Sequence, residues 1–157
     1  DGRGKRVMTG LYYEQFKIGM EFSHSLTRTV TEMDNIMFCA MTHNPQPLHL
    51  DEEFAKNTEY GQRIVNSMFT LGLLVGVTVG DTTLGTTLGN LGMTDVRFAN
   101  PVFHGDTLRA TTRVKSMRES KSRPTAGLVE LEHSAFNQAD KEVAYCVRTA
   151  LMLKRPT

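Results

Sequence analysis

Titratable and amide side chains gather in a short segment that contains two prolines, residues 42–49, with the sequence THNPQPLH. An imidazole titrates near neutral pH, so His49 can both accept and donate a proton, and His43 supplies a second imidazole. The amides of Asn44 and Gln46 cannot take a proton at neutral pH, but they can hold a water molecule by hydrogen bonds. The prolines restrict the backbone, and catalysis depends on polar groups held in place. The segment therefore predicts acid–base chemistry, and the alternative is a loop histidine that only caps the next helix.

Other kinds of site find no support in the sequence. It contains no Ser-His-Asp order and no cluster with metal-ligand spacing, so we expect no metal. The glycines of residues 85–92 follow neither phosphate-loop nor dinucleotide-loop spacing, so we expect no bound nucleotide cofactor. Asp51, Asp95 and Asp106 precede a helix, strands or turns, where an aspartate usually serves as a cap.

Length and composition indicate one globular domain in the 157 residues. The net charge is +1, so no overall field draws the chain toward nucleic acid or a membrane surface. Cys39 and Cys146 lie in apolar runs without a CxxC spacing, and we expect them to be buried and reduced in a cytoplasmic protein. Residues 1–10 lack the apolar middle of a signal peptide, and we interpret them as a flexible lead-in.

The segment 42–49 must be positioned by the helices around it. Thr31 can cap a short helix, with Asp34 three residues later and apolar residues following at helical spacing. The two prolines should end that helix and force an extended loop. Asp51 can cap a second short helix at residues 52–58, and residues 64–79 form a long helix that is apolar nearly all round. This last stretch is shorter than the roughly 20 residues of a membrane span, so we expect a core helix wrapped on most sides by a sheet.

Alternating apolar and polar residues supply that sheet. A first strand is expected at residues 22–30, and three consecutive ones at residues 107–117, 129–135 and 143–153. The sequence NQADK at residues 137–141 indicates a hairpin loop. A buried helix combined with consecutive half-buried strands predicts an α+β domain with an antiparallel sheet.

The segment from Phe38 to Gly72 resembles the hydratase motif of the MaoC-like (R)-specific enoyl-CoA hydratases. The matching positions are Thr42, Pro47, Leu48, His49, Ala55, Val65 and Met68. The sequence PVFHGDTL at residues 101–108 is similar to the family's entry into a sheet strand, and the likeness extends over residues 11–153. It implies a hot-dog fold at residues 11–157, in which a curved antiparallel sheet wraps a long helix. It also implies a homodimer or dimer of dimers, and an acyl-CoA substrate, with coenzyme A present only as part of that substrate.

The resemblance implies a role for several residues of the site. His49 would move the protons, and Asn44 would hold the water where the family has an aspartate. The amide of Ser67 would meet the thioester carbonyl at the start of the long helix, and a helix N-terminus suits the enolate that forms there. The alternative for Asn66 and Ser67 is that they only cap the helix.

The departures from the family pattern leave alternatives open. Asn44 replaces the family's aspartate, His43 its glycine, and Asn66-Ser67 its His-Gly pair. Either His49 is the sole acid and base, or His43 shares the work, or hydration has been lost. An acyl-CoA thioesterase and a non-catalytic acyl-thioester binder are therefore rivals, although hot-dog thioesterases commonly use a helix-borne acid and residues 64–79 contain none.

Substrate binding involves a wider set of candidates. Those expected to contact the substrate are Gln46, Asn66, Ser67, Met68, Arg97, Arg118 and Arg123. The arginines are chosen because the phosphates of coenzyme A favour basic groups, and Arg63 is an alternative. The basic loop around Lys121 could instead be an ordinary solvent-exposed hairpin. His104 lies either near the site or in a surface turn.

The variant HNPQPLH resembles the subgroup associated with hydration of mesaconyl-CoA (to β-methylmalyl-CoA) or of itaconyl-CoA. Such substrates are branched dicarboxylic monothioesters. A fixed aspartate beside the substrate's own carboxylate would repel it, and we expect that Asn44 removes this repulsion and that His43 adds attraction.

Overall fold

The computed structural model of the chain describes residues 10–156. The expected lead-in at residues 1–10 lies outside this range except for Gly10, whose N–H donates to the carbonyl of Leu84 at 3.2 Å. Within the described residues, no helix has the length and apolar character needed to cross a membrane.

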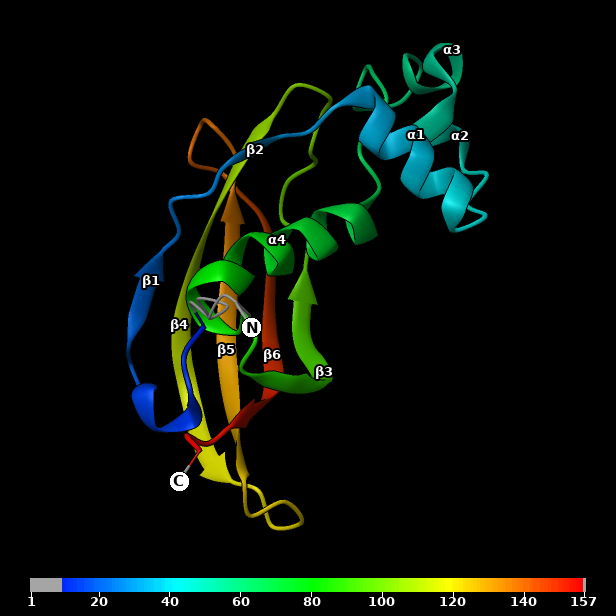
Figure 1. Cartoon of the computed structure of the whole chain (residues 1–157). Coiled ribbons are helices and arrows are strands. Elements are labelled where there is room, and N and C mark those ends of the chain that lie inside the picture. Colours follow the sequence, from blue (N-terminus) through cyan, green and yellow to red (C-terminus); the bar gives the residue numbers. More distant parts are fainter. Residues whose placement is uncertain (1–9, 157) are drawn as a thin grey trace, which may run out of the picture.

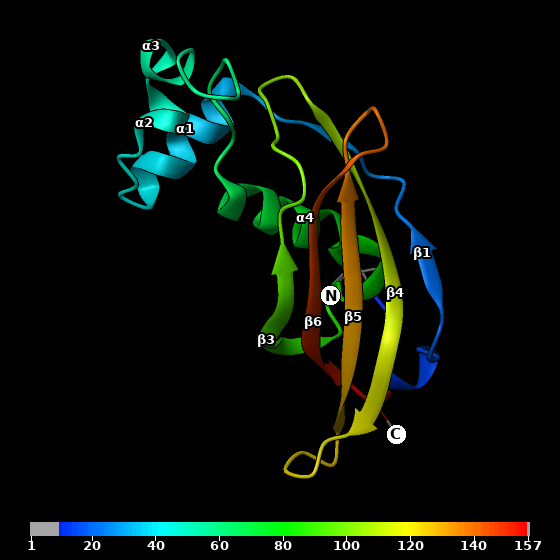
Figure 2. The ribbon, with the colours of Figure 1, turned by 180° about the vertical axis from the view of Figure 1, so that it is seen from behind.

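An antiparallel sheet forms the body of the molecule (Figure 1). Its strands are β1 (Glu21–Ser23), β2 (Arg28–Thr29), β3 (Thr87–Arg97), β4 (Thr107–Glu119), β5 (Ala126–Phe136) and β6 (Glu142–Leu153). The order across the sheet is β1-β4-β5-β6-β3, and β2 pairs with β4. The loop at residues 137–141 joins β5 to β6, which confirms the predicted hairpin. Figure 2 shows the strands from behind, with β3 at one edge.

One long helix, α4 (Ser67–Thr82), lies across one face of the curved sheet (Figure 1). Its buried residues Leu74 and Val77 pack with Ala110, Val143 and Cys146 of the sheet. Burial of these side chains away from water supplies the main stabilisation of the helix on the sheet. The arrangement confirms the α+β class and the predicted hot-dog fold.

The central helix differs from its expected position at residues 64–79. It begins at Ser67 because the side chain of Asn66 caps it by accepting the Met68 N–H, while Val65 is still extended and donates its N–H to Val102. It continues to Thr82. Within one chain the sheet also does not cover α4 on all sides, since Gly72 and Gly76 on the outer side of the helix are exposed.

Two strand expectations need correction. The expected strand at residues 22–30 is broken into β1 and β2, and Leu26 between them is 58% exposed because this segment follows the margin of the sheet. Strand β3 was not predicted. It lies at the edge of the sheet, where most of its side chains are exposed, so burial imposes no alternation on its sequence.

Three short helices project beyond one end of the sheet (Figure 1). They are α1 (Glu32–Met41), α2 (Pro47–Leu50) and α3 (Glu52–Ala55), and a single turn of 3-10 helix, η1 (Tyr13–Gln15), lies near the chain start. Thr31 and Asp34 form the predicted capping box of α1, and Asp51 caps α3 by accepting the Phe54 N–H. The prolines do not keep the whole loop extended: Pro47 begins α2, because its fixed φ suits the first position of a helix.

Candidate active site

His49 lies on α2, and its imidazole is oriented by the backbone carbonyl of a residue 15 positions later in the sequence. Its Nδ1 lies 2.8 Å from the carbonyl oxygen of Ile64. A carbonyl only accepts hydrogen bonds, so Nδ1 carries the proton and the neutral ring keeps a lone pair on Nε2. That Nε2 has no hydrogen-bond partner among the described residues. The ring is therefore arranged as a base with a fixed tautomer.

The N-terminus of α4 leaves one amide unused beside a cavity. The Asn66 N–H donates to Asn35 Oδ1 at 2.9 Å, and the Met68 N–H donates to Asn66 Oδ1 at 2.9 Å. Between them, the Ser67 N–H has no partner within the described part of the chain. Ser67 and Ile64 line a cavity of about 190 Å³, which Tyr60 also borders. A free amide at a helix N-terminus can stabilise a developing negative charge on a bound carbonyl oxygen.

The same cavity is closed on its other side by the segment between β3 and β4. The lining residues from this segment are Phe98, Ala99, Asn100, Pro101 and Val102. Asn100 is held in place because its Nδ2 donates to the carbonyl of Glu142 at 2.7 Å. Met68, in contrast, is 50% exposed and does not line the cavity.

Asn44 lies in a second hollow, which residues of α1 and Leu50 of α2 also line. Its Oδ1 accepts the N–H of Gln46 at 3.0 Å, and its own N–H donates to the carbonyl of Cys39 at 2.9 Å. Among the described residues no hydrogen bond joins Asn44 to His49. The Asn44 Nδ2 group remains available to a ligand.

His43 borders the same hollow as Asn44 and adopts a left-handed backbone with φ of 56°. The side chains of His43 and Gln46 are both exposed. His49 does not line this hollow, which Leu50 borders from α2. The structure thus links His49 to the segment before α4 through the Ile64 carbonyl, although His49 does not itself line the Ser67 cavity, and it places His43, Asn44 and Gln46 in the adjoining loop.

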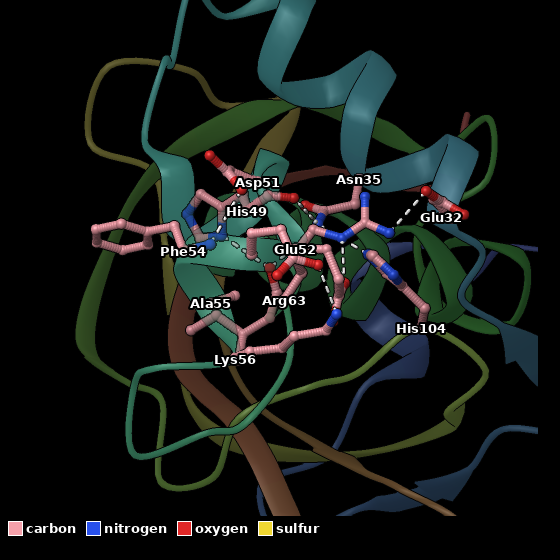
Figure 3. A network of polar contacts seen from close by, with 12 residues as sticks. Glu32, Asn35, His49, Asp51, Glu52, Phe54, Ala55, Lys56, Arg63 and His104 are labelled. Carbon is pink, nitrogen blue, oxygen red and sulfur yellow. Dashed lines mark hydrogen bonds and ion pairs between the residues drawn. The ribbon is translucent and has the colours of Figure 1, made fainter.

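Arg63 ties the projecting helices together. Its guanidinium donates to Glu32 of α1 at 2.8 Å and to Glu52 of α3 at 2.7 Å, and its side chain is only 14% exposed (Figure 3). These ion pairs raise the pKa of Arg63. The guanidinium is therefore occupied by its two carboxylates.

None of the other predicted basic groups lines the cavity beside Ser67. Arg97 ends β3, stacks 3.7 Å above the Tyr145 ring and pairs with Glu142 at 3.2 Å. Arg118 and Arg123 belong to the β4–β5 hairpin, which lies at the end of the sheet opposite α1–α3 (Figure 1). Neither of them lines the cavity within one chain.

The sequence analysis overlooked the buried Asn35 and left the place of His104 open. Asn35 of α1 is fully buried, and its Nδ2 lies 3.0 Å from His104 Nε2 (Figure 3). Burial and then the nearby Arg63 cation lower the pKa of His104, so its ring is held neutral. The signal for Asn35 was its i,i+4 spacing with Cys39, since these two form the buried face of α1 while Met37 is 52% exposed.

One carboxylate does lie on α4 beyond the range expected for the helix. Asp81 is in its last turn and binds His24 Nδ1 at 2.8 Å. Fourteen residues at a rise of 1.5 Å place it about 21 Å from Ser67 along the helix. α4 therefore carries no acid near the free amide, which counts against a helix-borne thioesterase carboxylate.

Comparison with known proteins adds a family and several relatives. The model of the MaoC like domain matches residues 14–135. A mesaconyl-CoA hydratase of Cereibacter sphaeroides is 30% identical over 97% of this chain and 44% of its own length. An (R)-specific enoyl-CoA hydratase of Rhodospirillum rubrum is 32% identical over 70% of this chain and 74% of its own length.

A solved structure shows the same architecture. The X-ray structure of a monoamine oxidase regulatory protein from Archaeoglobus fulgius has a TM-score of 0.84 and 33% identity, and the match covers 96% of this chain and 100% of that one. The chain spans less than half the length of the Cereibacter hydratase.

Proposed function

The chain belongs to the MaoC-like domain family, and from that premise we propose that it reversibly adds water to the double bond of an enoyl-CoA thioester. The observation that carries the proposal is the Nδ1 hydrogen bond of His49 to the Ile64 carbonyl at 2.8 Å, which leaves Nε2 as a base. Ile64 also borders the cavity into which the Ser67 amide is placed. A base and a free amide donor joined by one residue are the parts that this reaction needs.

The chemistry follows from these groups. His49 Nε2 takes a proton from water as the water oxygen bonds to the β-carbon of the substrate. The electrons of the double bond move toward the thioester carbonyl, and the Ser67 N–H donates to the oxygen on which negative charge develops. His49 then returns the proton to the α-carbon, so one water molecule has been added. Dehydration is the same path reversed.

Asn44 and His43 are proposed to complete the site. The Asn44 Oδ1 already accepts the Gln46 N–H, so its Nδ2 is the group that would donate to the incoming water. An amide cannot share the proton, so His49 carries the acid–base work alone in this proposal. His43 lies beside the same hollow and would contact the substrate rather than the water.

We propose a branched dicarboxylic thioester, such as mesaconyl-CoA, as the substrate. The Cereibacter relative is named as a mesaconyl-CoA hydratase, and Asn44 supplies no charge that would repel a substrate carboxylate. Asn44→Asp should weaken turnover of the dicarboxylic thioester relative to crotonyl-CoA, which carries no such carboxylate. A stronger preference for mesaconyl-CoA in that variant would contradict this account.

The rest of the acyl-CoA is proposed to contact the remaining candidates. Gln46 and Met68 are exposed near the two hollows and can cover the substrate. Arg97, beside the Ser67 cavity, can meet a phosphate only by leaving Glu142. Arg118 and Arg123 lie too far from Ser67 within one chain, so their role depends on assembly.

A homodimer, or a dimer of such dimers, is proposed as the working form. Strand β3 is an edge of the sheet, and its unpaired backbone groups invite pairing with a second strand. Apolar side chains on or beside it are exposed: Leu88, Leu91, Val96 and Phe98. A sedimentation measurement that finds only monomer at micromolar concentration would contradict the proposal.

We propose that the protein works in the cytoplasm. Cys39 and Cys146 are both buried and free, which suits a reducing compartment.

Hydration of mesaconyl-CoA and crotonyl-CoA by the purified protein, beside its His49→Ala variant, tests the function. Turnover of mesaconyl-CoA that disappears in the variant supports both the reaction and the substrate. Turnover of crotonyl-CoA alone keeps the reaction and removes the dicarboxylate. If neither thioester reacts, but mesaconyl-CoA binds with the same affinity to both proteins, the chain is a non-catalytic acyl-thioester binder.

A further inference from the structure

Asn35 touches four segments of the chain that meet around the site. Its Oδ1 accepts the Asn66 N–H at 2.9 Å. Its Nδ2 donates to the carbonyl of Ile64 at 3.1 Å and, at 3.3 Å, to the carbonyl of His49. The same Nδ2 lies 3.0 Å from His104 Nε2, so its two N–H groups are shared among three acceptors. A single buried amide therefore links α1, α2, the start of α4 and the β3–β4 connection.

Two of these contacts reach the groups that the reaction uses. The Ile64 carbonyl is the acceptor that fixes the His49 tautomer, and Asn35 occupies the other side of that oxygen. The Asn66 N–H precedes the Ser67 amide, and Asn35 holds it in place. The base and the oxyanion donor are thus held by opposite ends of one side chain.

Resting on the proposed function, we propose that Asn35 is a positioning residue that sets the tautomer of His49 and the direction of the Ser67 amide together. The amide side chain offers a donor and an acceptor side by side without carrying a charge. The acceptor must face Asn66, because the other side of the amide meets two carbonyl oxygens. The orientation of the amide is therefore fixed.

His104 reinforces this orientation. A donor faces its Nε2, so Nε2 is the unprotonated nitrogen and the ring carries its proton on Nδ1. Burial, followed by the Arg63 cation, lowers the pKa of His104, while Glu32 and Glu52 act in the opposite direction. The neutral ring is the form that accepts from Asn35.

The substitution Asn35→Asp tests the proposal with almost no change of shape. A carboxylate only accepts hydrogen bonds, so it keeps the contact to Asn66 but faces the carbonyls of Ile64 and His49 without a donor. Nitrogen-15 NMR of histidine-labelled protein should show the Nδ1–H tautomer of His49 in the parent protein and a mixture of tautomers in the variant. The His49→Asn variant identifies the signal by its loss.

Kinetics supply the second readout. With mesaconyl-CoA, kcat of Asn35→Asp should fall on the order of 100-fold, because a displacement of about 1 Å costs that much. Asn35 does not line the cavity, so KM should change far less than kcat. Asn35→Ala removes the amide without adding a charge, and it should also lower kcat. This second variant keeps the proposal testable if Asn35→Asp does not fold.

Thr112→Val is the matched control, since Thr112 is buried and hydrogen-bonded to two histidines far from the site. It should lower the unfolding temperature and leave the His49 tautomer and kcat unchanged. If both Asn35 variants keep the parent tautomer signal, Asn35 is merely structural and the proposal is overturned. The tautomer measurement needs no turnover, so it decides the role of Asn35 even if hydration fails.

Discussion

Two buried polar networks occupy this small domain, and they differ in what they leave unpaired. The first surrounds Asn35 and His49 at the N-terminal end of α4 (Figure 3). The second crosses the sheet beneath the other end of α4, from Arg148 of β6 to Asp81. The sheet network contains two buried histidines, His24 and His133, whereas His49 and His104 of the first network are partly exposed.

The sheet network forms one directed chain of hydrogen bonds when both of its histidines are neutral. Arg148 Nε donates to His133 Nε2 at 3.1 Å, and His133 Nδ1 then donates to Thr112 Oγ1 at 2.8 Å. The Thr112 hydroxyl donates to His24 Nε2 at 2.8 Å, and His24 Nδ1 donates to Asp81 at 2.8 Å. Every imidazole nitrogen of this network therefore has a partner.

The network around His49 leaves a base and a donor unpaired, whereas in the sheet network the buried Nη2 of Arg148 has no partner among the described residues. His49 Nε2 and the Ser67 N–H keep no partner within residues 10–156, and Ser67 borders a cavity. An unpaired group that is sealed in the core, such as Arg148 Nη2, cannot meet a ligand, whereas an unpaired donor that borders a cavity can. Unused hydrogen-bonding capacity next to a cavity is thus the better guide to function.

The largest expected effect is a loss of catalytic activity when the network around His49 is changed. In His49→Asn, the amide Nδ2 can still donate to the Ile64 carbonyl, but the base at Nε2 is gone. The rate of hydration should fall on the order of 1,000-fold, the range of general acid–base catalysis, with little change in the unfolding temperature. Stopped-flow or coupled assays of mesaconyl-CoA hydration measure it, and a rate within a few fold of the parent would exclude His49 as the base.

A smaller effect concerns stability in acid. Burial, followed by the Arg148 and His24 charges, lowers the pKa of His133 from its ordinary 6.5 to about 3. Between these pH values the unfolded chain therefore binds more protons at His133 than the folded chain does. The contribution of His133 to the free energy of unfolding is fully present above pH 6.5 and is lost as the pH falls toward 3. His133→Gln removes this titration, and urea unfolding across that range should show a flatter dependence of the unfolding free energy on pH. An unchanged slope would contradict the assignment.

The smallest effect is expected at the exposed end of the sheet network. The side chain of Asp81 is 55% exposed, so water screens its interaction with His24. Asp81→Asn keeps an oxygen that can accept from His24 and should cost about 0.5 kcal/mol in the free energy of unfolding, as exposed pairs do. A loss of several kcal/mol in chemical denaturation would mean that the carboxylate charge stabilises the whole network.

Local patterns predicted much of the architecture. The alternation in β4, β5 and β6, the hairpin at residues 137–141 and the capping box of Thr31 and Asp34 all depend on neighbours close in sequence. Strand β3 was not predicted, because this edge strand buries few side chains on either face and so shows no alternation of apolar and polar residues. The start of α4 was misplaced because its apolar run continues backward into an extended segment held by Val102.

The sequence by itself determined which side chains are available for acid–base chemistry, and that His49 follows a proline-restricted loop. Only the tertiary structure decided that Nδ1 of His49 meets the Ile64 carbonyl, that Asn35 occupies the other side of that oxygen, and that the Ser67 amide stays free. The reason is physical: residue types fix which groups can donate or accept hydrogen bonds. Which donor meets which acceptor depends on segments that only packing brings together.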